Sequence, residues 1–333
     1  MAKNRPIPII ILLLSPIVII LAIVLSVIYG AKDININIIR DAFLNFDGEN
    51  VNHQIIMYSR IPRVIGALLI GAFLAISGAL MQGMTRNYLA SPSIMGVSDG
   101  SVFAITICMI FFPDTSSLNM IFYSFIGSAI GAGLVFGLAS LTPNGMSPVR
   151  LAIIGTITGS FLSSISAALS TYFQVSQNIS FWYNAKLHQI TPDKIKIIIP
   201  FAIIGIITSL IISKSITILS LGEEISISLG QNTKLIKIVA MGTVVILTGI
   251  SVALAGKIAF VGLIIPHIVR FFVGSDYRWI VPCSGVMGAI LLAFSDIISR
   301  FINYPFETPI GVVTSFIGVP FFLYLARTKG GKK

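Results

Sequence analysis

The sequence predicts an all-α protein that crosses a membrane about ten times. Of its 333 residues, 55% are hydrophobic and only 10% are charged, whereas soluble domains carry about 25% charged residues. A chain of this composition could not cover a water-facing surface of normal polarity. Apolar runs of roughly 20 residues recur from end to end, and each is long enough to cross a bilayer core of about 30 Å.

The apolar runs divide the chain into ten predicted helices within a single transmembrane domain over residues 1–333. Asp99 and Gly100 interrupt the third run, and Gly256 alone separates the seventh from the eighth. The predicted spans are residues 7–29, 62–83, 94–112, 119–141, 150–173, 196–213, 234–255, 257–273, 279–298 and 309–326.

The first run imitates a secretory signal, because Lys3 and Arg5 precede apolar residues. It extends from Ile7 to Tyr29, which is longer than the roughly 7–15 apolar residues of a signal peptide, and it has no clear cleavage site. We therefore expect it to remain as a transmembrane helix. With ten spans both termini lie on one side. Basic residues in the termini and in the loops on that side predict that it is cytoplasmic.

Small residues in three of the predicted helices indicate close helix contacts. Glycines four residues apart share one helix face, where they allow two backbones to approach. The pairs are Gly127 with Gly131, Gly133 with Gly137, and Gly155 with Gly159.

The sequence gives no sign of a metal site or of nucleic-acid binding. Cys108 and Cys283 lie beside or within apolar runs, where cysteine behaves as a small buried residue. His53, His188 and His267 are far apart, and no CxxC or HExxH motif occurs. The net charge of +10 is spread between the spans, without an RNA- or DNA-reading motif. It fits membrane topology and attraction to anionic partners.

The chain has no nucleotide-binding loop of its own. A P-loop needs the pattern GxxxxGK[ST], whose glycines let backbone amides surround a phosphate. The nearest string runs from Gly249 to Lys257; its spacing is wrong, and Ile258 replaces the serine or threonine. The sequence also contains no nucleophile–base pair that would indicate an enzyme. Any ATP-driven step would therefore belong to a partner protein.

Three stretches carry patterns beyond composition. The first begins with Arg60-Ile-Pro-Arg63 and ends with Met95-Gly-Val-Ser-Asp-Gly100. The second is Leu221-Gly-Glu-Glu-Ile-Ser-Ile-Ser-Leu-Gly-Gln-Asn232. The third runs from Ala255-Gly-Lys-Ile-Ala-Phe-Val-Gly262 through Pro266-His-Ile-Val-Arg270 to Gly318-Val-Pro-Phe-Phe-Leu323.

These stretches closely resemble the FecCD/BtuC-type permease family, whose members import iron–siderophore, haem and cobalamin complexes with ATP. The resemblance covers almost the whole chain, from about residue 58 to 327. Residues 87–100 and 301–309 are most similar to Feu-type permeases for catecholate siderophores such as bacillibactin. The chain departs from the wider family at Tyr88 and Lys257, where proline is usual, and at Glu223, where aspartate is common.

The resemblance implies the type II ABC importer permease fold and a set of partners. These are a second permease subunit, identical or related, two cytoplasmic ATPase subunits that hold ATP and Mg, and an outer substrate-binding lipoprotein. No cofactor and no nucleic acid are expected on this chain. The expected cargo is a ferric siderophore of the catecholate type, with haem or cobalamin as alternatives. A proton-coupled secondary transporter, with acids in relay positions, is the alternative from another class.

By position, Arg60, Arg63 and Arg300 match the family's basic contacts for acidic residues of the binding protein. An arginine suits this role because its planar fork binds a carboxylate through two hydrogen bonds. The alternative is that the arginines anchor helix ends at the membrane surface. Asp296 and Glu307 are expected to pair with Arg300, which lies four residues after Asp296.

Residues 219–233 match the cytoplasmic segment that docks on the ATPase in this family. The segment is short and polar, and glycines bracket one or two predicted helical turns. An ordinary loop is the alternative. Two acids near a helix start would also favour the positive end of its dipole. The candidate contacts are Gly222, Glu223, Glu224, Ser226, Leu229 and Gly230.

The span 150–173 carries five serines: Ser160, Ser163, Ser164, Ser166 and Ser170. Their hydroxyl groups could bond to carbonyl groups of their own helix, or they could face a water-filled path. Ser160, Ser163 and Ser164 are the candidates for lining a translocation path. Lys257 is the fourth candidate, because a cation near the outer mouth would concentrate an anionic ferric complex.

Overall fold

The computed structural model describes residues 6–30, 34–88, 90–143, 147–183, 187–304 and 306–330. Its elements are α1 (Ile7–Ile28), α2 (Ile36–Leu44), α3 (Val51–Ile55), the π-helical turn η1 (Ile56–Arg60), α4 (Ile61–Thr85), the 3-10 turn η2 (Pro92–Met95), α5 (Val97–Phe111), α6 (Ser117–Leu141), α7 (Pro148–Tyr172), α8 (Ser176–Tyr183), the 3-10 turn η3 (Leu187–Gln189), α9 (Pro192–Leu221), α10 (Glu223–Ser228), α11 (Thr233–Ala255), α12 (Val261–Val273), α13 (Tyr277–Phe301) and α14 (Ile310–Gly330). Within those ranges, one isolated bridge between Asn303 and Phe306 is the only β-type pairing. The all-α prediction is confirmed.

Seven helices in the described part of the chain are long and apolar enough to cross a membrane. They are α1, the continuous helix Val51–Thr85, α6, α7, α9, α11 and α13. Three further apolar helices are shorter, namely α5, α12 and the Ile310–Leu323 part of α14. Each of the ten predicted spans corresponds to one of these helices; α2, α8 and α10 lie outside the predicted spans, and α3 extends the second one. The multi-pass prediction is confirmed, with ten as an approximate count.

Polar residues just before several helices explain where those helices begin. The side chain of each accepts a hydrogen bond from a backbone N–H of the first turn, which has no partner within the helix. These residues are Asn35 before α2, Asn50 before α3, Ser116 before α6, Asn232 before α11 and Asp276 before α13.

The helix α4 is the centre of the fold. It contacts α1, α9, α11, α12 and α13, and 78% of its most apolar window is buried. Glycines make this packing possible: a Cβ atom on Gly71 would overlap the carbonyl oxygen of Gly288 in α13, and one on Gly78 would overlap that of Gly262 in α12. The backbones therefore touch directly, as small residues allow in membrane helices.

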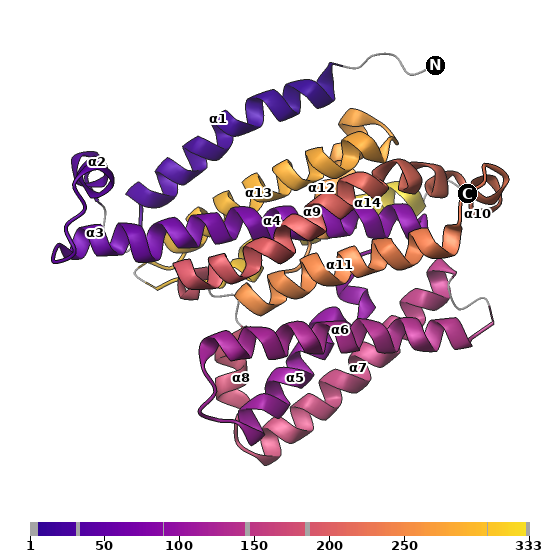
Figure 1. Cartoon of the computed structure of the whole chain (residues 1–333), viewed down its shortest axis with the longest axis horizontal. Coiled ribbons are helices and arrows are strands. Elements are labelled where there is room, and N and C mark those ends of the chain that lie inside the picture. The colour runs from indigo at the N-terminus through magenta and orange to yellow at the C-terminus, as the bar shows by residue number, and fades with distance from the viewer. Residues whose placement is uncertain are drawn as a thin grey trace.

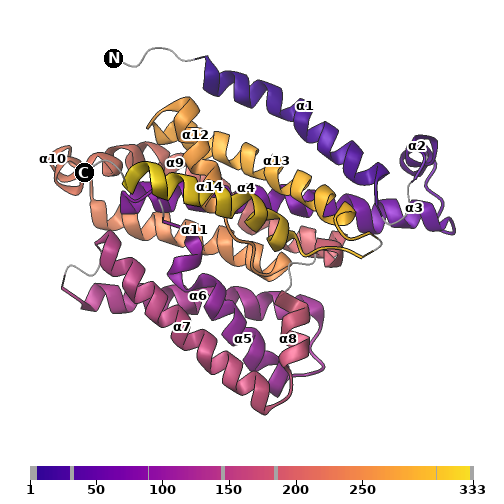
Figure 2. The same ribbon diagram turned by 180° about the vertical axis from the view of Figure 1, so that it is seen from behind.

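The helices α5, α6 and α7 form a second group, with α8 beside them. The helix α11 connects this group to the helices around α4 (Figures 1 and 2). Gly127 and Gly131 of α6 lie against Gly100 and Gly96 at the start of α5. The predicted close contact is confirmed for this pair. It is wrong within this chain for the pair Gly133 and Gly137, because no atom of the described residues lies within 4 Å of a Cβ built on either.

The bundle has two distinct ends. The helices α2 and α3 lie at one end, and α10 lies at the other, together with the first turn of α1 and the last turns of α14 (Figures 1 and 2). We call them the α3 end and the α10 end. The N- and C-terminal helices therefore start and finish on the same side, as an even number of crossings requires.

Candidate functional site

At the α3 end, Arg63 connects three elements through ion pairs. Its side chain and that of Asp296 on α13 are 9% and 2% exposed. Arg63 Nη2 donates to Asp296 Oδ1 at 2.8 Å, and Arg63 Nε lies 3.0 and 3.1 Å from the two carboxylate oxygens. Arg63 Nη1 donates to Glu307 Oε1 at 2.5 Å. Arg63 thus joins the first turn of α4 to α13 and to the loop before α14.

Arg300 connects the same carboxylate to α1. Its Nη2 contacts Asp296 and donates to Ser26 Oγ at 2.8 Å. Its Nη1 donates to the carbonyl oxygens of Ser26 and Tyr29 at 2.8 and 2.9 Å. The predicted pairing of Asp296 with Arg300 is confirmed. Glu307 is bonded to Arg63 instead of Arg300, because the loop before α14 brings it to the start of α4.

Arg60 supports α1 from a second direction. It donates to the carbonyl oxygens of Val27 and Ile28, and its Nη2 would lie 2.9 Å from a Cβ on Gly30. The last carbonyls of a helix have no partner within it and form the negative end of its dipole. Arg60 and Arg300 therefore satisfy and neutralise the end of α1.

These contacts correct one assumption of the docking prediction. Arg60, Arg63 and Arg300 are only 6%, 7% and 6% exposed, whereas the prediction took their guanidinium groups to be available to an outer partner. They are buried because the carbonyls of α1 and two carboxylates surround them. The docking role itself stays a prediction.

Glu307 lies outside the membrane-spanning helices, and its side chain is 37% exposed. His188 Nδ1 lies 3.4 Å from Glu307 Oε2. Hydrogen bonds from His188 and Arg63 hold the pKa of Glu307 down to about 2. Its carboxylate is therefore ionised at every physiological pH.

At the α10 end, the segment 219–233 contains the helical turns that the sequence predicted. Gly222, at φ +142°, precedes α10, and Gly230, at φ +79°, follows it. The N–H of Gly230 donates to Ile227 O at 2.8 Å, and that of Gln231 to Ser226 O at 3.0 Å. This pair of bonds is the Schellman arrangement, in which a glycine in the left-handed conformation ends a helix.

The candidate coupling residues divide into internal and exposed groups. Ser226 is buried and its Oγ donates to Gln231 Oε1 at 2.6 Å. Glu223 accepts from Lys237 Nζ at 2.8 and 2.9 Å and from Thr233 at 3.2 Å. These bonds, chiefly that of Lys237, hold the pKa of Glu223 below its usual value. Glu223 and Ser226 therefore fix α10 to the start of α11.

Three apolar side chains at α10 are exposed, on both flanks of the buried Ser226. The exposed fractions are 63% for Leu229, 48% for Ile225 and 58% for Ile227. Glu224 is also exposed. Two of these side chains, Ile225 and Ile227, were missed by the sequence reasoning. Their alternation with serines in a polar segment was the available signal. A short, rigid helix with exposed apolar side chains is suited to docking in a partner's groove.

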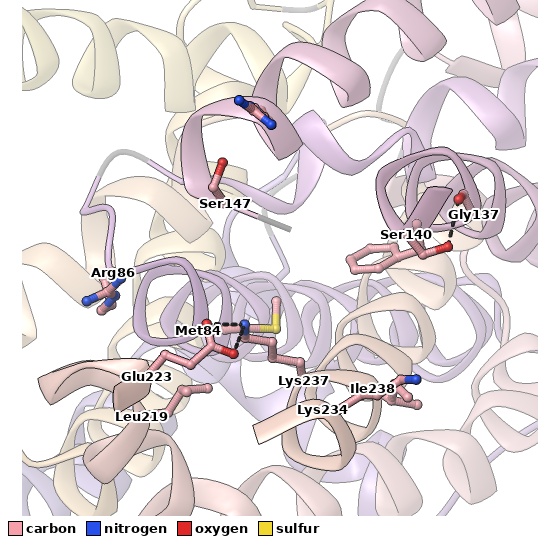
Figure 3. A pocket seen from close by; sticks show the side chains of 12 residues that line it. Met84, Arg86, Gly137, Ser140, Ser147, Leu219, Glu223, Lys234, Lys237 and Ile238 are labelled. Atoms are coloured by element: carbon pink, nitrogen blue, oxygen red, sulfur yellow. Dashed lines mark hydrogen bonds and ion pairs between the residues drawn. The ribbon is translucent and has the colours of Figure 1, made fainter. Parts of the chain in front are cut away.

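A cavity of about 880 Å³ separates α10 from α7 (Figure 3). It is bordered by the ends of α4, α6, α7, α9 and α11 as well as by α10. The ion pair between Glu223 and Lys237 forms part of its wall (Figure 3). Its other basic side chains are Arg86, Arg150 and Lys234, so cations outnumber the single carboxylate.

In the middle of the bundle, two helices begin well inside it. The helix α5 has 15 residues and α12 has 13, so they extend about 22 and 20 Å and are shorter than the bilayer core of about 30 Å. Their starts are neighbours, since a Cβ on Gly262 would lie 3.4 Å from Pro92 Cδ in η2. Non-helical backbone at membrane depth occurs only where it is buried in protein or lines a cavity.

Asp99 lies in the first turn of α5 and brings two predicted path residues together. Ser163 Oγ, near the middle of α7, donates to Asp99 Oδ1 at 2.9 Å. Lys257 Nζ, in the break between α11 and α12, lies 3.7 Å from the same oxygen. Sequence reasoning missed Asp99 as a site residue, although its carboxylate was the feature that interrupted the apolar run.

The remaining serines of α7 differ in their surroundings. Ser166 donates to Leu162 O at 2.8 Å and Ser170 to Ala167 O at 2.9 Å, both within the same helix. Ser160 and Ser164 are exposed. The bonding of hydroxyl groups to their own helix is therefore observed for Ser166 and Ser170, while the path-lining role of the exposed pair stays a prediction.

Tyr88, one of the two departures from the family pattern, lies away from this break. The guanidinium carbon of Arg270 is 4.2 Å from the centre of its ring, and Arg270 Nη2 donates to Tyr277 Oη at 2.8 Å. Tyr88 therefore stacks on a cation that also binds α13.

In the described residues, no group of three His, Cys, Asp or Glu side chains is arranged to hold a metal ion.

The model of the FecCD transport family matches residues 18–328. The chain is 63% identical over 324 residues to the iron-uptake system permease protein FeuB of Bacillus subtilis (strain 168), covering 97% of each chain. It is 48% identical to the iron(3+)-hydroxamate import system permease protein FhuB of the same organism, covering 91% of this chain and 79% of FhuB.

A solved structure has the same fold. It is described as an inward-facing conformation of a metal-chelate type ABC transporter, and it matches with a TM-score of 0.82 and 27% identity, over 96% of this chain and 99% of that chain. The similar proteins are transport subunits and not enzymes. This chain belongs to the FecCD transport family, as a multi-pass membrane permease with the fold of an ABC importer subunit.

Proposed function

We propose that the chain is one of two permease subunits of an ATP-driven importer that carries a ferric siderophore, of the catecholate type, across the cytoplasmic membrane. The observation that carries this proposal is the 63% identity to FeuB over 97% of both chains. Two cytoplasmic ATPase subunits supply the energy from ATP and Mg. An outer lipoprotein delivers the cargo, and the cargo is released unchanged.

The proposed orientation has the α10 end in the cytoplasm, with both termini, and the α3 end outside. Basic residues in the termini and near α10 support it through the positive-inside rule. The test is cysteine labelling of intact cells with an impermeant reagent. Cysteines at positions 45 and 303 should be modified, and those at 225 and 330 should not. Labelling of position 225 from outside would reverse the orientation and remove the coupling role of α10.

The coupling role is assigned to residues 219–233. Ile225, Ile227, Leu229 and Glu224 are the contacts with the ATPase, and Gly222, Glu223, Ser226 and Gly230 fix the shape of α10. The support is the combination of exposed apolar side chains with a helix tied at both ends. ATP binding and hydrolysis would then move α10 as a rigid unit.

The translocation path is proposed to pass the break between α11 and α12, with Lys257 and the α7 serines Ser160, Ser163 and Ser164 along it. A tris-catecholate ferric complex is anionic, so an exposed cation there attracts it. The side chain of Lys257 is 49% exposed. Docking of the lipoprotein near Arg60, Arg63 and Arg300 has positional support alone, because they lie at the end opposite α10.

Haem or cobalamin are the alternative cargoes within the family, and proton-coupled transport is the alternative mechanism. The acids most suited to a proton relay, Asp296 and Glu307, are both ion-paired to Arg63. This arrangement favours a structural role for both over proton transfer.

The decisive experiment is reconstitution of the complete transporter in proteoliposomes. Uptake of iron-55 as a ferric tris-catecholate should require ATP on the α10 side, and should exceed uptake of haem or cobalamin. Uptake driven by a proton gradient without ATP, or preference for haem or cobalamin, would contradict the proposal.

A further inference from the structure

We propose that Asp99 is an intramolecular counter-ion that holds Lys257 until an anionic cargo displaces it. The inference rests on the proposed function. It gives Asp99 a defined role beside the break between α11 and α12. Lys257 Nζ lies 3.7 Å from Asp99 Oδ1 in the structure. When a trianionic ferric tris-catecholate arrives, the ammonium group exchanges one anion for another.

The two members of the pair differ in how firmly they are held. Asp99 is fixed, because its Oδ1 accepts from Ser163 at 2.9 Å and its Oδ2 lies against Gly159, where a Cβ would approach to 2.5 Å. Its side chain is 16% exposed. A carboxylate in the first turn of α5 is also stabilised by the helix dipole.

The backbone of Lys257 is fixed, while Asp99 holds its ammonium group only loosely. Gly256 and Phe260, with φ of +71° and +70°, shape the segment between α11 and α12, and Phe260 packs where any side chain on Gly318 would be. The ammonium group, in contrast, lies 3.7 Å from the carboxylate, beyond the usual length of about 2.7–2.9 Å for a charge-assisted hydrogen bond. The four-carbon stem can turn towards a cargo while its base stays in place.

The arrangement suits transport, which requires that a cargo be bound and then released. A cation without a competing anion would bind the trianion more firmly and slow its release. A carboxylate that competes for the same ammonium group weakens that binding and refills the site once the cargo has moved on. Ser163 keeps Asp99 in position during the exchange.

The test compares substitutions in the reconstituted transporter, using ferric tris-catecholate as the probe. Asp99→Asn removes the competing anion, so the cargo concentration at half-maximal uptake should fall by up to about fivefold, the range of an exposed ion pair. Lys257→Met keeps the apolar stem but removes the charge, so that concentration should rise. Opposite shifts support the exchange. Shifts in one direction, or none, would overturn it.

A glycine substitution provides a second route to the same state. Gly159→Ala would push the Asp99 carboxylate away, so it should resemble Asp99→Asn. Gly133→Ala is the matched control, because Gly133 lies in open space on the neighbouring α6 and should behave as wild type. An effect of Gly133→Ala equal to that of Gly159→Ala would contradict the steric argument.

A readout independent of uptake separates this inference from the proposed function. The reactivity of Lys257 towards an amine-directed reagent, mapped by mass spectrometry, should rise in Asp99→Asn and fall when ferric tris-catecholate is present. Wild type that imports the complex while Asp99→Asn leaves Lys257 reactivity unchanged would overturn the counter-ion role alone. Wild type that imports no ferric siderophore would overturn the proposed function.

Discussion

The two ends of the bundle use charge in opposite ways. At the α3 end, Arg60, Arg63 and Arg300 are buried and bonded to acceptors of the same chain. At the α10 end, one pair between Glu223 and Lys237 holds α10, while apolar side chains remain exposed. The difference indicates that several buried charges hold the helices together at the α3 end, whereas a single, partly exposed pair holds α10.

The largest expected effect is the loss of Arg63. Arg63→Met leaves the buried Asp296 with Arg300 as its remaining cation and leaves Glu307 with His188 alone. Removing one partner of a buried ion pair costs about 3–5 kcal/mol, so the midpoint of thermal unfolding in detergent should fall clearly. Arg278→Met is the control, because Arg278 forms an exposed pair with Asp276 and its loss should leave stability unchanged. Equal stability of the two variants would mean that the α3 end does not depend on its buried pairs.

The next effect concerns α10. Leu229→Asp should leave unfolding unchanged but weaken ATPase association, because burying a leucine contributes about 1.5–3 kcal/mol. Leu229→Met should retain association. Binding of the ATPase subunits to detergent-solubilised permease measures both. A loss of stability in Leu229→Asp, with ATPase binding intact, would give α10 the structural role assigned here to the α3 end.

A charge reversal tests the same segment by a different route. Reversing both Glu223 and Glu224 should uncouple uptake from ATP while membrane insertion continues. Glu223→Gln alone should loosen α10, because it breaks the pair with Lys237, whereas Glu224→Gln should act only on the partner. Normal uptake and complex assembly in the doubly reversed variant would move the docking site elsewhere.

A smaller effect distinguishes docking from helix support at the α3 end. If the arginines contact the lipoprotein, its association should weaken as salt rises, because the screening length falls from about 10 Å at 0.1 M to about 3 Å at 1 M. Arg60→Lys should change this little, while Arg60→Glu with Arg63→Glu should abolish siderophore-dependent growth, partly through the loss of the Arg63 ion pairs with Asp296 and Glu307. If the double variant is folded and has the affinity and salt dependence of wild type, the docking role is excluded.

The smallest effect is the pH dependence of Glu307. Its pKa is about 2 in the folded protein, below its ordinary value of 4.5, so its stabilising contribution is complete above that ordinary value. The contribution is lost as pH falls from about 4.5 to about 2. Glu307→Gln should remove this part of the acid sensitivity. A thermal-unfolding series over that pH range would contradict the assignment if wild type and variant lose stability in parallel.

Hydropathy was sufficient to predict the helices but not their depth. An apolar run of the right length identifies α9 or α11 directly. It does not reveal that α5 and α12 begin inside the bundle, because that depends on the contact of Gly262 with Gly78 in a distant helix. For the same reason Asp99 was noticed as an interruption, while its contact with Lys257 could not be foreseen.

The contacts at the two ends of the bundle were also only partly predictable from the sequence. Asp296 and Arg300 are four residues apart on one helix, so their pairing could be predicted from the sequence. The burial of Arg60 could not, because its partners are backbone carbonyls of α1, which the sequence does not distinguish from any others. At α10, two glycines predicted the helical turns, but the outward direction of Ile225 and Ile227 depends on how Ser226 and Glu223 are bonded.

The contacts of α1 also have a consequence for the order in which the protein is made. α1 leaves the ribosome first, but two of the groups that bind its last turn come later: Arg60 follows α3, and Arg300 lies near the end of α13. Only 17% of its most apolar window is buried, and its main packing partner, α13, is also made late. During synthesis the first helix must therefore wait in the lipid with its final carbonyls unbound, and the α3 end is completed only when the ninth predicted span has been inserted.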